Sequence, residues 1–447
     1  MPSAPALLRD VIRLAWPAVV QGLLTTVVFF TDRLILGGYS DLALGSMSIS
    51  SPLMWSVFSV FGAISAGTMA VVGRRIGAGR RDEAGEVMGA VLVASGLLGL
   101  LVAAGGIPLR DTIAAVLAGG ADTSQTIRDM AATYMGIVLA IAPLKMVGDA
   151  GFTALQASGD TRSPMWISGA CGGLNLLLSW LLVGGQLGAP ELGIVGAAIG
   201  TAAAFSLQPI LVLWVASSPQ ATLPLRRPSR ALSTLLGPVA RISLPTLGEN
   251  SIYHPAYVAF SALVGWLGDV AMTAHQALIA IESLGFIAAG GFGVASSAIV
   301  AQRLGAGAPE EAARAGWYAT GLSVGALSLV SVLLWVFPEA LVGIFSDDPE
   351  IITTGAQCLR VAAIAQPLMA LTDAMAGALR GAGDTKNPMR AAIAGPLLVR
   401  LSLCWLLAFH LDLGLLGIWI GTTFDWLVRG VYLTVVFARG RWRQIAV

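Results

Sequence analysis

Several carboxylates lie inside long apolar stretches of this 447-residue chain, among them Asp32 near the start and Glu249, Glu282 and Asp373 in the second half. An ionisable group in apolar surroundings is costly unless it faces a cavity or a partner. A carboxylate held there favours binding a proton or a hard cation. These positions therefore predict cation-binding chemistry, with Asp32 as the candidate for ion coupling.

An imidazole and a carboxylate come close together in the stretch that contains Glu249. His254 follows five residues later, and Pro255 comes directly after it. A carboxylate and an imidazole at this spacing can each titrate near neutral pH. Proline loosens a helix and frees backbone carbonyls, as is frequent at transporter sites. The alternative is that one or both side chains lie near a helix end and face water.

Glu282 is flanked by apolar residues in AHQALIAIESLGF, so it requires either a polar cavity or a buried packing role. Gln276 lies upstream, nearer the outer end of the same stretch. The residues that we expect to bind substrate or to take part in coupling are Glu249, His254, Glu282, Asp373 and Gln276.

Two pairs of opposite charges have members four residues apart: Lys145 with Asp149, and Asp425 with Arg429. This spacing puts both side chains on one helix face, where they can pair locally. A structural and a functional role remain equally open for each pair. Asp373 corresponds to Asp149 in an internal repeat but lacks a basic neighbour, so Asp373 is the better functional candidate.

The elements that position these residues follow from composition. The chain is 56% hydrophobic and only 11% charged, whereas soluble domains carry about 25% charged residues. About twenty apolar residues are needed to cross a bilayer, and the sequence contains about twelve such runs. The first is expected to be a retained helix, not a signal peptide. The predicted spans are 12–36, 43–72, 85–106, 130–155, 165–184, 193–216, 236–264, 271–300, 313–337, 354–379, 389–410 and 413–437.

The two halves of the chain repeat each other. Pro17 matches Pro245 and Asp41 matches Asp269 at an offset of 228, and two further blocks match at offsets of 224 and 221. The sequence therefore predicts an all-α membrane protein with two parallel six-helix repeats around a central cavity. The expected parts are an N-lobe (1–216), a cytoplasmic linker (217–235) and a C-lobe (236–447).

Orientation follows from the arginines and lysines of the loops. If the N-terminus is cytoplasmic, the outer loops hold only Arg110 and Arg128, and all the other loop Arg and Lys residues are inside. Positive residues favour the cytoplasmic side. Both termini are therefore predicted to be cytoplasmic.

Several repeated stretches, taken together, are specific to one family: IGAGRRDEA with LGAGAPEEA, ALQASGDTRSP with GALRGAGDTKNP, and AHQALIAIESLGF. In these the whole chain resembles the multidrug and toxic compound extrusion (MATE) family, in particular its bacterial NorM- and DinF-like members. The resemblance implies a monomeric transporter in the bacterial inner membrane. It also implies antiport of cationic or amphipathic organic compounds, driven by inward H⁺ or Na⁺.

The resemblance also implies site residues. Asp32 matches the acidic residue of the family's first helix, which is implicated in cation coupling, and Asn175 and Thr201 look like N-lobe site residues. An acidic residue is expected four positions after the asparagine, but Ser179 stands there. A Na⁺ ion near Asp32 is thus one option, and the missing carboxylate together with His254 favours H⁺.

Other function classes are less compatible with the sequence. A lipid or lipid-linked glycan flippase of the same superfamily is the alternative, because Arg33, Lys145 and Arg400 could line a cavity for phosphate. The sequence lacks HExxH, P-loop and catalytic-triad patterns, so we expect neither an enzyme nor an ATP-driven pump. We expect no cofactor beyond the coupling ion. A small-molecule substrate and membrane lipid are the expected partners, and a nucleic acid is not.

Overall fold

The computed structural model describes residues 4–117 and 124–447, and this part of the chain is helical, without strands. The helices of the first half are α1 (Ala4–Tyr39), α2 (Asp41–Phe61), α3 (Ile64–Gly77), α4 (Arg81–Leu117), α5 (Gln125–Ala140), α6 (Ala142–Ala157), α7 (Arg162–Val183) and α8 (Ile194–Ser217). Those of the second half are α9 (Leu232–Gly265), α10 (Asp269–Gly305), α11 (Pro309–Val336), α12 (Pro338–Val342), α13 (Pro349–Gly381), α14 (Lys386–Ala394), α15 (Leu401–Trp405) and α16 (Gly414–Ala438). Short π-helical segments, η2 (Gly395–Arg400) and η3 (Leu406–His410), continue α14 and α15.

The predicted fold class, a membrane protein of about twelve spanning helices, is confirmed. Within the described ranges, nine helices are long and apolar enough to cross a membrane, and ten if α5 and α6 form one bent span. Helices α9 and α16 coincide with the two remaining predicted spans, 236–264 and 413–437.

Two predicted spans consist of two helices each. The span 43–72 is broken after α2, where Gly62 caps the helix. The span 130–155 bends by 57° between α5 and α6. Pro143 stands in the first turn of α6, where its missing N–H costs little. Hydropathy is continuous through both breaks, so apolar length alone does not reveal them.

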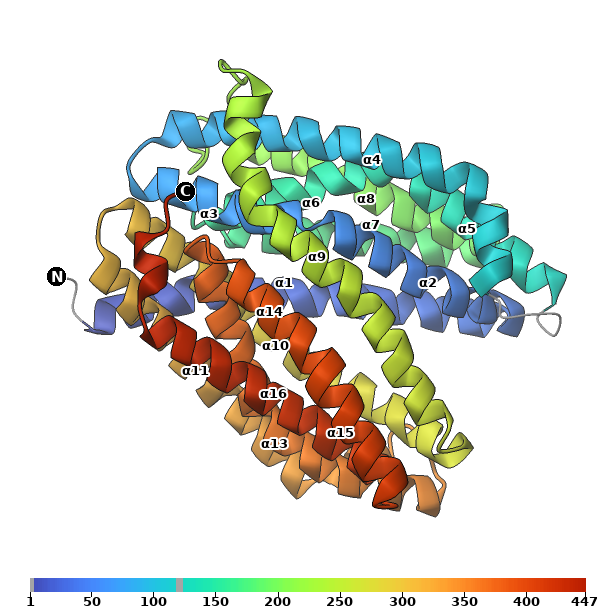
Figure 1. Cartoon of the computed structure of the whole chain (residues 1–447). Helices are drawn as coiled ribbons and strands as arrows, with labels where there is room; N and C mark the ends of the chain where they lie inside the picture. Colours follow the sequence, from blue (N-terminus) through green and yellow to red (C-terminus); the bar gives the residue numbers. More distant parts are fainter. Residues whose placement is uncertain (1–3, 118–123) are drawn as a thin grey trace. The chain divides into compact units, whose positions relative to one another are not determined.

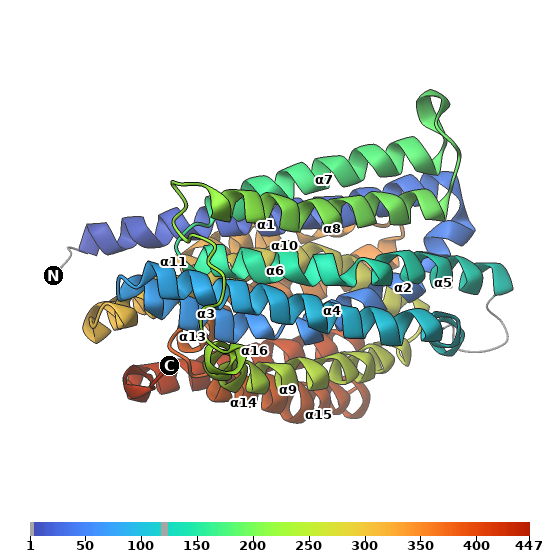
Figure 2. The ribbon, with the colours of Figure 1, turned by 90° about the horizontal axis from the view of Figure 1, so that it is seen from above.

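The described part of the chain folds into two compact units, the N-unit and the C-unit. The N-unit comprises Val20–Thr68 and Arg80–Ala240, and the C-unit comprises the described residues up to Val19, then Met69–Gly79 and Arg241–Val447. In the N-unit, α7 lies along α8 and α4 lies along α6 (Figure 2). In the C-unit, α13 packs against α10, α11 and α16 (Figure 1).

Small residues bring the helices of the C-unit into backbone contact. A Cβ atom on Gly377 of α13 would lie 2.2 Å from the carbonyl oxygen of Gly293 of α10. A Cβ atom on Gly381 would lie 2.1 Å from the carbonyl oxygen of Ser297. Such close approach is typical of helices packed in membranes.

The acidic residues of the repeated GAG stretches hold the peptides that follow α8 and α16. In the N-unit, Arg226 Nε donates to Asp82 Oδ1 at 2.8 Å, and a Cβ atom on Gly85 would lie 2.1 Å from the Pro224 carbonyl oxygen. In the C-unit, Arg443 Nη1 donates to Glu310 Oε1 at 2.5 Å. Asp82 and Glu310 correspond in the repeat, so each half uses the same position to hold its following peptide.

Candidate functional site

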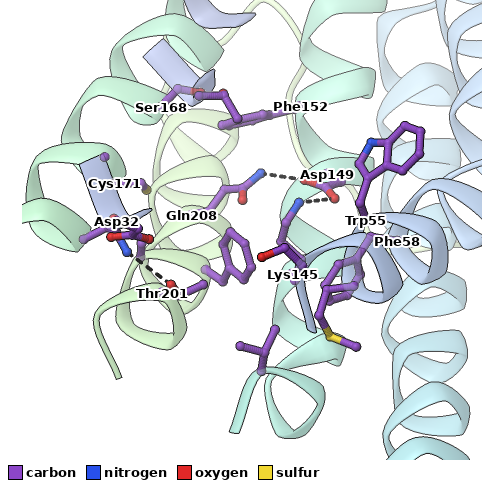
Figure 3. Close-up of a pocket in the computed structure, with 18 of the residues that line it drawn as sticks. Asp32, Trp55, Phe58, Lys145, Asp149, Phe152, Ser168, Cys171, Thr201 and Gln208 are labelled. Atoms are coloured by element: carbon purple, nitrogen blue, oxygen red, sulfur yellow. Dashed lines mark hydrogen bonds and ion pairs between the residues drawn. The ribbon is translucent and has the colours of Figure 1, made fainter. Parts of the chain in front are cut away.

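A cavity of about 310 Å³ lies within the N-unit, lined by residues of α1, α2, α5, α6, α7 and α8. Figure 3 shows its side chains converging from several helices. Part of the lining is aromatic, and its charged side chains fall into two clusters, one around Asp32 and one around Lys145. The aromatic lining residues are Trp55, Phe58, Tyr134, Phe152 and Phe205.

The first cluster surrounds the Asp32 carboxylate, which is buried with 5% of its surface exposed. In the amide orientation that satisfies its neighbours, Asn175 Nδ2 donates to Asp32 Oδ1 at 3.0 Å. The Asn175 oxygen then accepts from the Thr201 backbone N–H at 3.1 Å and from its hydroxyl at 3.2 Å. The Tyr134 hydroxyl lies 3.4 Å from Thr201 Oγ1. The structure thus brings Asp32, Asn175 and Thr201 together, although they come from three helices.

Ser179 lies one turn after Asn175 on α7 and is fully buried. Its hydroxyl lies near the Asp32 carboxylate, as do the side chains of Asn175 and Thr201. A Cβ atom on Gly200 would lie 2.5 Å from Ser179 Oγ, so α7 and α8 pack tightly here. Because this position holds a hydroxyl, Asp32 is the only carboxylate of this cluster.

The second cluster is the ion pair of Lys145 and Asp149 on α6. The predicted local pairing is confirmed, and both residues line the cavity. Gln208 of α8 donates from Nε2 to Asp149 Oδ1 at 3.1 Å. The Lys145 ammonium lies 4.9 Å from the Phe205 ring centroid and 5.6 Å from that of Phe58. Local spacing could not reveal Gln208, which is 59 residues from Asp149.

The charges of the cavity follow from these two clusters. Its charged lining residues are Asp32, Lys145 and Asp149, so with all three ionised the net charge is −1. Aromatic faces and an uncompensated carboxylate in one cavity are the features that bind organic cations.

The predicted C-lobe candidates lie outside this cavity. Glu249 of α9 is buried and accepts from Arg380 Nη2 at 2.6 Å. His254, also on α9, is half-buried, with its ring 5.9 Å from that of Tyr253. Glu249 therefore has a cationic partner that sequence spacing did not reveal.

The remaining candidates come from α10 and α13. Glu282 is half-buried, and its Oε1 atom has no hydrogen-bond partner in the described part of the chain. Gln276 is exposed. Asp373 is half-buried, and the charges of Arg380 and Arg429 act on its carboxylate.

A buried charge cluster joins η2 to α16 in the C-unit. Asp425 is fully buried and accepts from Arg400 Nη2 and from Arg429 Nε, each at 2.8 Å. The Arg429 guanidinium stacks 3.9 Å from the Trp426 ring centroid. A Cβ atom on Gly395 would lie 2.2 Å from Asp425 Oδ1, so glycine is required there. The predicted Asp425–Arg429 pair is confirmed, and Arg400 is a partner that the sequence did not reveal.

Comparison with known proteins adds family evidence to this geometry. A family model described as MatE matches residues 17–181 and 245–406, one stretch in each half of the chain. The chain is 28% identical over 463 aligned residues to the probable multidrug resistance protein NorM of Thermotoga maritima, covering all of this chain and 95% of the relative. It is 27% identical over 428 residues to the multidrug resistance protein NorM of Burkholderia vietnamiensis, covering 94% and 92% of the two chains. A crystal structure of the Vibrio cholerae MATE transporter VcmN shares the fold, with a TM-score of 0.89, 19% identity and 97% of each chain covered.

Proposed function

This chain belongs to the MatE family, whose members are membrane transporters and not enzymes, and we propose that it exports cationic or amphipathic organic compounds in exchange for H⁺ or Na⁺. The observation that carries the proposal is the N-unit cavity, where the buried Asp32 carboxylate shares one lining with five aromatic side chains. The relatives named as multidrug resistance proteins support the substrate class.

The proposed exchange depends on competition for one carboxylate. Asp32 binds either the coupling ion or the positive charge of the substrate, because a single buried carboxylate compensates one charge at a time. Asn175 donates to the carboxylate and so orients it. Ion binding therefore releases the substrate, and substrate binding releases the ion. The C-unit residues Glu249, His254, Glu282, Asp373 and Gln276 remain candidates for a second role in binding or coupling.

The proposal places the transporter in the bacterial inner membrane as a monomer, with both termini in the cytoplasm. The one-sided distribution of arginine and lysine among the loops supports this orientation. A flippase is less favoured, because a phosphate group requires a cationic site and the charges of the N-unit cavity sum to −1.

The proposal is tested with purified protein in liposomes and the fluorescent cation ethidium. We expect an imposed proton gradient to drive ethidium transport and a sodium gradient to drive little, because Ser179 replaces the second carboxylate that Na⁺ would favour. Liposomes with protein but no gradient are the control. If neither gradient drives ethidium transport, the proposed exchange is refuted. If only a sodium gradient drives it, the choice of ion is refuted.

A further inference from the structure

We propose that Lys145 sets the charge selectivity of the N-unit cavity, so that the cavity accepts organic cations with one positive charge and rejects those with two. This inference rests on the proposed function and adds a substrate class to it. It is carried by the position of the Lys145–Asp149 pair on the wall of the same cavity as Asp32.

The Lys145 ammonium is directed at the cavity and not withdrawn from it. Its side chain retains 17% of its surface exposed, and that of Asp149 retains 36%. The ammonium lies over the Phe205 and Phe58 rings, which also line the cavity. Lys145 therefore occupies aromatic surface that the cationic group of a ligand would otherwise use.

The fold does not require a charge pair at this position. In the sequence repeat, Met369 of α13 corresponds to Lys145, at an offset of 224. Met369 is fully buried in a hydrophobic cluster with Ala289, Ala365 and Trp426. An apolar residue thus serves the equivalent site of the C-unit, so packing alone does not explain the lysine.

The effect of Lys145 follows from counting charges. With the pair intact, the cavity has one uncompensated carboxylate, Asp32, which matches a monocation. A second positive charge on the ligand would meet the Lys145 ammonium in a partly apolar site, where charges interact more strongly than in water. Without Lys145, Asp149 becomes a second free carboxylate, and the cavity charge becomes −2, which matches a dication.

The test uses ethidium and propidium, which share one aromatic core and carry one and two positive charges. Their dissociation constants are measured by fluorescence with purified full-length protein and with variants that change the cavity charge in steps. Lys145→Met gives −2, Asp149→Asn gives 0, and the double variant returns to −1. Lys386→Met is the matched control, because Lys386 is the other lysine of the chain and is exposed.

We expect wild type to bind ethidium about tenfold more tightly than propidium, and Lys145→Met to shift that ratio about tenfold toward propidium. Asp149→Asn should weaken ethidium binding about tenfold, since it leaves Lys145 uncompensated. The double variant should regain the wild-type ratio although it shares the smaller side chain of Lys145→Met, which separates charge from size. Lys386→Met should keep the wild-type ratio.

Two different failures have different meanings. If wild type does not bind ethidium, the proposed function fails. If it binds ethidium but the ratio is the same in Lys145→Met, or if the double variant keeps the ratio of the single variant, the role of Lys145 is wrong. If Lys145→Met does not fold, Asp149→Asn and the double variant decide, because undiminished ethidium binding by the former overturns the inference.

Discussion

Replacing Asp32 with asparagine should abolish gradient-driven export, lowering the transport rate of ethidium by roughly 100-fold or more. Asparagine has nearly the same size, and its oxygen can still accept from Asn175, so the fold should be retained. It cannot carry the negative charge that a substrate cation or a coupling ion requires. The measurement is the initial rate of ethidium transport in liposomes with an imposed proton gradient.

The control for this substitution is Asp41→Asn, which makes the same chemical change at an exposed position in the first turn of α2. It should transport at close to the wild-type rate. Equal melting temperatures of the Asp32→Asn variant and wild type would exclude misfolding as the cause of a loss. Wild-type transport by Asp32→Asn would disprove the role assigned to this carboxylate.

The largest effect on stability should come from Asp425→Asn. Asp425 is fully buried and compensates two guanidinium groups, those of Arg400 and Arg429. Removing one partner of a buried ion pair typically costs about 3–5 kcal/mol, because an uncompensated charge remains inside. We expect a marked fall in the temperature at which the purified protein aggregates, together with lower yield.

An exposed ion pair provides the contrast. Glu339 accepts from Arg360 Nη2 at 2.7 Å, with 55% of the Glu339 side-chain surface exposed. Exposed pairs often contribute nothing measurable, so Glu339→Gln should leave the aggregation temperature unchanged. If Asp425→Asn proved as stable as Glu339→Gln, the buried cluster would have no part in holding η2 against α16.

The helices could be predicted because a bilayer imposes a minimum apolar length and because each half of the sequence checks the other. The breaks near Gly62 and Ile141 could not, since apolar length does not distinguish a straight span from a bent one. Pro143 was a local signal for the second break. The glycine contacts between α10 and α13 also depend on helix positions that hydropathy does not supply.

The candidate site was predictable in part. Asp32 stood out as a carboxylate in an apolar run, and the family resemblance added Asn175, which donates to Asp32, and Thr201, which donates to Asn175. Pairs four residues apart were found correctly, because a helix brings them together regardless of the fold. Partners distant in sequence were missed, namely Gln208 for Asp149, Arg380 for Glu249 and Arg400 for Asp425.

The net charge of the N-unit cavity has a consequence for the energetics of export. If Asp32 holds one monovalent ion on the inward step and one organic monocation on the outward step, a full cycle moves no net charge. A membrane potential is worth roughly 2.3 kcal/mol per elementary charge per 100 mV, and an electroneutral exchange neither uses nor opposes it. We therefore expect a potassium diffusion potential set with valinomycin to leave ethidium transport unchanged. Acceleration by a negative interior would show that more than one ion enters per cation. On this account the cell maintains export as long as its ion gradient persists, even when its membrane is depolarised.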